Sequence, residues 1–112
     1  MPTYNRREML FEGREICKSA NLVCSPLGDE LLIYDSASGC VHVLNKTAHQ
    51  VWKWLDQGMG AAEMVNRFCD SYAGATPEIA NRDVLQILRV FFESAIIITR
   101  VKSPAQAIRV AG

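Results

Sequence analysis

The pattern of apolar residues changes at Asn45, and this change constrains the fold more than any other feature of the sequence. Before Asn45, short β-prone runs cover residues 22–24, 30–35 and 40–44. A turn at residues 26–29 and a Ser/Gly loop at residues 36–39 separate them, as in hairpins. After Asn45, apolar residues recur at helical spacing. The sequence therefore predicts a small antiparallel sheet followed by helices.

Three helices are expected after this change. Asn45 is a favoured N-cap for the first helix, Gly58 and Gly60 end it, and Gly74 ends the second. The third begins at residues 76–78 with a capping threonine, a proline at the first helical position and an acid in the first turn, and runs to about residue 94. Residues 96–99 are β-branched enough to form a short final strand.

This order of elements predicts an α+β fold of the winged helix-turn-helix type, with a three-stranded antiparallel sheet followed by three helices and a short C-terminal strand. A chain of 112 residues holds one such domain, expected over residues 21–100. Residues 1–20 are expected to be an extension that is flexible or contacts a second protomer, with a short helix around residues 7–15 or no fixed structure. Residues 101–112 are expected to be a tail.

Composition narrows the function classes. Twelve basic residues balance twelve acidic ones, so the chain lacks the positive charge that drives nucleic-acid binding. No apolar run is long enough to span a membrane and no signal sequence opens the chain, so a cytoplasmic protein without membrane contact is expected. Four cysteines without a C-x-x-C pair favour free, mostly buried thiols over zinc ligands; they are Cys17, Cys24, Cys40 and Cys69.

Catalytic signatures are missing from the sequence. It has no phosphate-binding glycine loop, no H-E-x-x-H and no G-x-S-x-G motif. The two histidines, His42 and His49, lie in an expected strand and the following helix, where both could be surface residues, and neither has an acidic partner at a spacing that indicates a dyad. The sequence therefore predicts a protein that is not an enzyme and uses no cofactor and no metal.

Two elements are candidates for binding. The third helix carries an apolar arc roughly 160° wide, broader than a helix that covers a core on one side needs. Its centre is formed by Val84, Leu88, Phe91 and Ala95, with Ile87 on one side and Leu85 and Phe92 on the other. The part of this apolar arc that the core does not need is covered by a partner, by the N-terminal segment or by a second protomer. The run 40–44, if it lies at the sheet edge, offers unpaired main-chain groups to another chain.

These residues resemble the PqqD family, named for coenzyme PQQ synthesis protein D. The resemblance rests on Leu32–Asp35, a turn at Gly39, the run Val43–Ala48, the pair Val51-Trp52, Leu55, Tyr72 and the pair Asp83-Val84, and it covers roughly residues 21–100. The family usually has glycine after the third helix, where this chain has Ala95, so the left-handed turn there would need another solution.

The resemblance implies a non-catalytic peptide-binding module, also called a RiPP recognition element. Such a module binds the leader of a ribosomally made precursor peptide and presents it to a modifying enzyme, such as a radical SAM protein or a leader peptidase. The leader adds as a strand to the third β-strand and packs against the third helix. Carried onto this chain, the peptide-binding residues are Val41, His42, Val43 and Leu44, with Leu85, Arg89 and Phe92 on the helix. The flank with Ile87 and Val90 is the alternative.

Two other readings stay open. A winged-helix DNA-binding protein would use polar residues of the third helix, namely Asn81, Arg82, Gln86 and Arg89, but many large apolar residues interrupt them. A dimeric accessory subunit of a maturation enzyme, with residues 1–20 exchanged between protomers, would show no peptide affinity.

Overall fold

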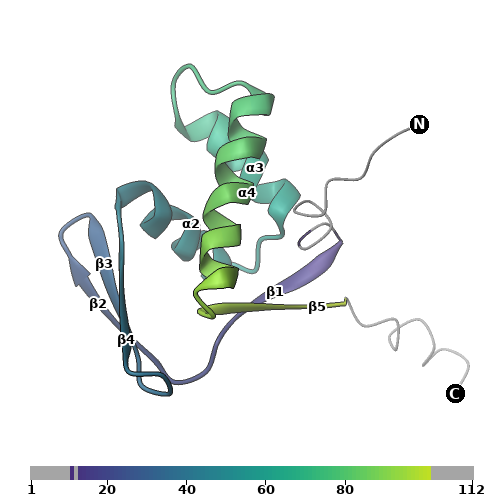
Figure 1. The fold of residues 1–112 in the computed structure, drawn as a ribbon. Helices are drawn as coiled ribbons and strands as arrows, with labels where there is room; N and C mark the ends of the chain where they lie inside the picture. The colour runs from purple at the N-terminus through teal and green to yellow at the C-terminus, as the bar shows by residue number, and fades with distance from the viewer. Residues whose placement is uncertain (1–10, 12, 102–112) are drawn as a thin grey trace, which may run out of the picture.

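A computed structural model describes residue 11 and residues 13–101 of the chain. The strands and helices follow in the order β1 (Arg14–Lys18), β2 (Leu22–Leu27), β3 (Glu30–Asp35), β4 (Cys40–Leu44), α2 (Lys46–Asp56), α3 (Ala61–Ser71), α4 (Pro77–Glu93) and β5 (Ile97–Val101). The expected α+β class is confirmed: the three-stranded antiparallel sheet of β2, β3 and β4 precedes three helices, and a C-terminal strand follows (Figure 1). β1 is an additional strand before this sheet.

The three-stranded sheet has the order β2–β3–β4, so β2 and β4 are its edges. Side chains alternate across it: Leu31 and Ile33 of the central strand and Leu44 of β4 are buried in the core. Strand β2 is longer than expected, because Pro26 and Leu27 belong to it rather than to the turn. Proline is tolerated there because an edge strand does not need every main-chain donor.

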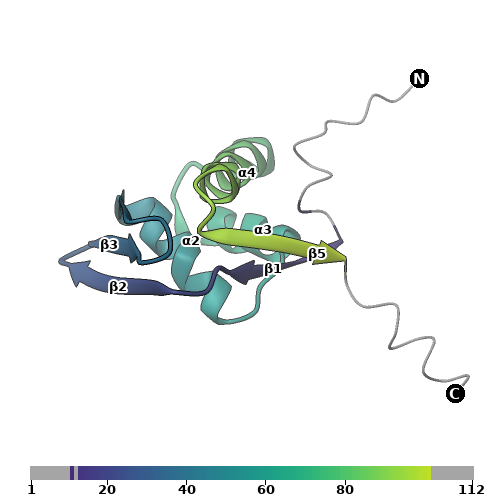
Figure 2. The same cartoon turned by 60° about the horizontal axis from the view of Figure 1, so that its bottom comes forward.

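A second sheet joins the two ends of the domain. β1 pairs antiparallel with β5, and Figure 2 shows the two strands side by side. Glu15 lies opposite Arg100 and accepts a hydrogen bond of 2.8 Å from it, which raises the pKa of the Arg100 guanidinium. Of the helix considered over residues 7–15, the described residues Arg14 and Glu15 instead start β1, and residues 1–10 and 12 lie outside the described part.

The segment before residue 21, expected as an extension, contributes to the packed structure where it is described. Phe11 is buried in the core. Lys18 pairs with Asp56 at the end of α2, and its ammonium lies 4.3 Å from the ring centroid of Trp52. The segment thus packs against the helices. The expected tail, residues 102–112, lies outside the described residues, and Val101 ends β5.

The core stripe of α4 is Val84, Leu88 and Phe91, all essentially inaccessible, as the spacing predicted. The rings of Phe91 and Trp52 pack edge to face with centroids 5.5 Å apart, and this contact holds α4 against α2. Ala95, expected in the same stripe, is exposed instead, because the helix ends at Glu93.

Ala95 itself adopts the left-handed conformation that favours glycine, with φ of 62°. Its N–H donates to the carbonyl of Phe92, and the N–H of Ile96 donates to that of Phe91. These two bonds form a Schellman motif, and the flanking apolar pair of this motif, Phe91 and Ile96, is buried. The Ser19 hydroxyl donates to the Ala95 carbonyl at 2.6 Å, which ties this turn to the chain after β1.

The structure places His49 and the cysteines as follows. His49, for which a surface position was considered, is buried, and its Nδ1–H donates to the Asp29 carbonyl at 2.8 Å, joining α2 to the β2–β3 turn. The four cysteines are free, but they are not mostly buried: Cys24 and Cys40 are exposed because they lie on the two edge strands.

Candidate peptide-binding groove

A groove of about 380 Å³ lies between the end of β4, the start of α2 and one side of α4. One wall comes from Val43, Leu44, Asn45, Thr47 and Ala48, and the other from Asp83, Gln86, Ile87, Val90 and Phe91 of α4. The cap at Asn45, whose side chain accepts from the Ala48 N–H at 2.9 Å, turns the chain from strand to helix at the rim of the groove.

The strand that borders the groove has a free edge. Among the described strands, only β3 pairs with β4. The main-chain groups of β4 that point away from β3 therefore have no strand partner in the described part of the chain. Such an edge accepts an extended peptide as an additional strand.

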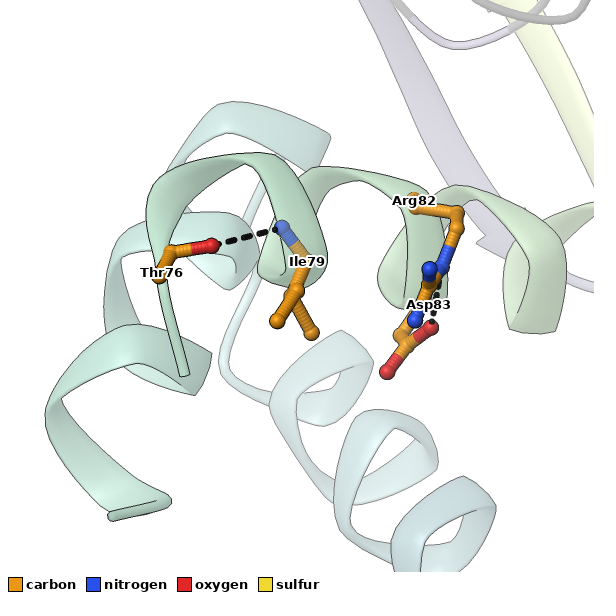
Figure 3. Close-up of polar contacts among 4 residues, drawn as sticks. All are labelled: Thr76, Ile79, Arg82 and Asp83. Carbon is orange, nitrogen blue, oxygen red and sulfur yellow. Dashed lines mark hydrogen bonds and ion pairs between the residues drawn. The ribbon is translucent and has the colours of Figure 1, made fainter. Parts of the chain in front are cut away.

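The α4 wall is one helical stripe, since its five residues follow at i, i+3, i+4, i+7 and i+8. The start of this helix is fixed by Thr76, whose hydroxyl accepts from the Ile79 N–H at 3.2 Å, and by proline at the first helical position (Figure 3). One turn later, Arg82 donates to the Asp83 carboxylate at 3.1 Å (Figure 3). The stripe begins with that carboxylate.

The other flank of α4 lies away from the groove. Phe92 packs edge to face on Phe11 with ring centroids 6.2 Å apart, Leu85 is half-buried against the core, and Arg89 pairs with Glu93 at 3.1 Å. The helix residues chosen from the sequence, Leu85, Arg89 and Phe92, therefore do not line the groove, and Phe11 of the N-terminal segment packs on Phe92. The alternative flank, with Ile87 and Val90, lines it.

The four strand residues chosen from the sequence divide in two. Val43 and Leu44 line the groove, whereas Val41 and His42 do not. Val41 is exposed on the face of the sheet opposite the core. His42 is half-buried on the inner face, and its Nε2 atom has no hydrogen-bond partner within the described residues.

Six lining residues were not identified from the sequence as peptide-binding residues: Asn45, Thr47, Ala48, Asp83, Gln86 and Phe91. Asn45 is the cap that follows β4, Thr47 and Ala48 come after it, and the other three belong to the same stripe of α4 as Ile87 and Val90. Helical spacing alone would have found the second set once the flank was known.

The groove offers binding rather than catalytic chemistry. Among its described lining residues, Asp83 is the one that is ionisable, and the set contains no cysteine, serine, histidine or lysine. Within residues 11 and 13–101, no three His, Cys, Asp or Glu side chains are grouped so that they could hold a metal ion. No helix in the same part of the chain has the length and apolar character needed to cross a membrane.

A family model for coenzyme PQQ synthesis protein D (PqqD) matches residues 30–97, more than half of the chain. This protein belongs to the PqqD family. The matched region runs from β3 to the start of β5 and so contains both walls of the groove. No curated protein matches the sequence.

Two solved structures share the fold of this PqqD-family chain. One is TbiB1 in complex with the TbiA(beta) leader peptide, with a TM-score of 0.68, 21% identity, and coverage of 72% of this chain and 93% of the other. The second is a lasso peptide synthetase B1 complexed with the leader peptide, with a TM-score of 0.69, 19% identity, and coverage of 75% and 98%.

The PqqD-family domain also exposes an apolar sheet surface. Tyr34 lies between Val23 and Val41 in the strand register, and Leu32 lies beside Val43. We call these five residues the outer face. Val23, Val41 and Val43 are each more than half exposed, at 59%, 55% and 60%. An antiparallel sheet usually places polar residues on its solvent side, so an apolar outer face indicates contact with another molecule.

Proposed function

We propose that this protein is a non-catalytic peptide-binding protein that recognises the leader segment of a ribosomally made precursor peptide and presents it to a modifying enzyme. The observation that carries the proposal is the free edge of β4 beside a groove lined by α4. Family membership and the two fold relatives, each solved with a leader peptide, support it. The precursor peptide is released from ribosomes in the cytoplasm, and we expect the protein to act there.

The leader would add to β4 as an antiparallel or parallel strand and fill the groove with alternate side chains. Main-chain bonds to residues 41–44 would supply affinity, and Ile87 and Val90 would supply apolar contacts, since both line the groove and Val90 is 52% exposed. Ordering a disordered leader costs entropy, so we expect micromolar affinity, about −8 kcal/mol.

The test is a fluorescence anisotropy titration with labelled synthetic peptides that copy the N-terminal half of short reading frames encoded beside the gene. Neighbouring strand residues point their amides to opposite sides, so one of His42 and Val43 presents its N–H to the free edge. Proline at that position removes the donor and leaves the ladder to β3 intact. We expect one of His42→Pro and Val43→Pro to fold and to bind at least about tenfold more weakly. Full affinity in every folded proline variant would contradict strand addition.

The modifying enzyme requires a surface that the leader leaves open. The outer face meets this need, and it is continuous with the groove because Val43 belongs to both. A strand added to β4 would widen the outer face, so an enzyme docked there would touch the bound leader as well. We therefore propose the outer face as the docking surface for the modifying enzyme.

A further inference from the structure

The two walls of the groove each have a polar end and an apolar end. On α4 the polar residues Asp83 and Gln86 come first, and the apolar residues follow. On the other wall apolar Val43 and Leu44 come first, and Asn45, Thr47 and the small residue Ala48 follow. In Figure 1, β4 runs upward to α2 while α4 runs downward to β5, so the polar residues of both walls lie toward the same end of the groove.

The polar end carries a carboxylate whose cationic partner lies outside the groove. Among the described residues that line the groove, Asp83 is the one with an ionisable side chain, and that side chain is 35% exposed. Its partner Arg82 is the preceding residue, stays 69% exposed and does not line the groove. A pair between adjacent exposed side chains contributes little, so a second cation can approach the carboxylate from the groove.

We infer that the guest peptide carries a lysine or arginine side chain that pairs with Asp83, next to an apolar side chain seated against Ile87, Val90 and Phe91. This inference rests on the proposed function and adds the chemistry of the peptide. A charged donor to a carboxylate that the peptide shields from water is stronger than a neutral one. An acidic side chain at the same place would be repelled by the negative charge of Asp83, because little water remains there to screen the repulsion. Peptides with an acidic residue at this position are therefore disfavoured.

The test uses the full chain and a displayed library of random peptides, so no natural ligand is needed. Selection on the wild type is expected to enrich peptides that combine apolar residues with lysine or arginine. Selection on Asp83→Lys is expected to enrich aspartate or glutamate in their place. The matched control is Asp70→Lys, which makes the same change in net charge at an exposed site on α3 outside the groove.

Anisotropy titrations of one enriched peptide then measure how much the charge pairing with Asp83 contributes to affinity. Replacing its basic residue with glutamate is expected to weaken binding to the wild type about tenfold, and to strengthen binding to Asp83→Lys. Asp83→Asn, a milder change, is expected to remove most of the preference while keeping the apolar contacts.

The outcomes separate this inference from the proposed function. Enriched apolar peptides with no charge preference, or a preference that Asp83→Lys and Asp70→Lys alter equally, would overturn the role of Asp83 and leave peptide binding standing. No enrichment of any peptide on the folded wild type would overturn the proposed function as well.

Discussion

The ring of Phe11 packs edge to face on the ring of Phe92, with centroids 6.2 Å apart. This contact covers the flank of α4 that carries Phe92 and leaves the flank with Ile87 and Val90 to line the groove. A residue far from the helix in sequence thereby determines which side of the helix can meet a ligand.

Phe11→Ala is expected to lower the free energy of unfolding by about 3–5 kcal/mol, because Phe11 is 1% exposed and its removal leaves a cavity beside α4. Urea denaturation measures the change. Leu27→Ala, at a site 52% exposed, serves as the control and is expected to change stability by no more than about 0.5 kcal/mol. Equal stability of the Phe11 variant and the wild type would contradict the packing described.

Ala95→Gly is expected to stabilise the protein by about 0.5–1 kcal/mol, since φ at Ala95 is 62° and glycine adopts this conformation without the steric cost of a Cβ atom. Thermal unfolding measures the gain. The opposite change, Gly74→Ala at φ of 81°, is expected to destabilise by about 1 kcal/mol. A lower melting temperature for Ala95→Gly would show that the turn does not strain alanine.

Val90→Glu is expected to weaken peptide binding at least about tenfold while leaving stability nearly unchanged, because Val90 lines the groove and is 52% exposed. Ile98→Glu makes the same chemical change at a site 49% exposed on β5, outside the groove, and is expected to bind as the wild type does. Anisotropy titration compares the two. Equal losses in both variants would remove the groove as the binding site.

Val23→Glu is expected to keep peptide affinity within about twofold and to slow modification of the bound peptide about tenfold, because it places a charge in the apolar outer face. The readout is turnover by the modifying enzyme encoded beside the gene, with peptide at saturating concentration. Undiminished turnover would exclude this part of the outer face as the docking surface.

The strands β2 to β5 and the three helices were predictable from the amino-acid sequence, whereas β1 was not, because the signals that define the predicted elements are local. The cap at Asn45 and the Thr76-Pro77 start define the first turns of α2 and α4, and the hairpin of β3 and β4 follows from two β-prone runs around a short loop. Helical spacing likewise identified the core positions Val84, Leu88 and Phe91. Each of these features depends on residues only a few positions apart.

Which surfaces stay open depends on contacts between distant parts of the chain. Helical spacing gives the width of the apolar arc of α4, but the covered flank depends on where Phe11 packs, more than seventy positions earlier in the chain. The pairing of β1 with β5 was also not predictable from local sequence. Main-chain hydrogen bonds are the same for every residue type, so they do not specify which distant strand a strand pairs with. The free edge of β4 and the position of Asp83 in the groove follow from these long-range contacts, which form only when the whole chain packs.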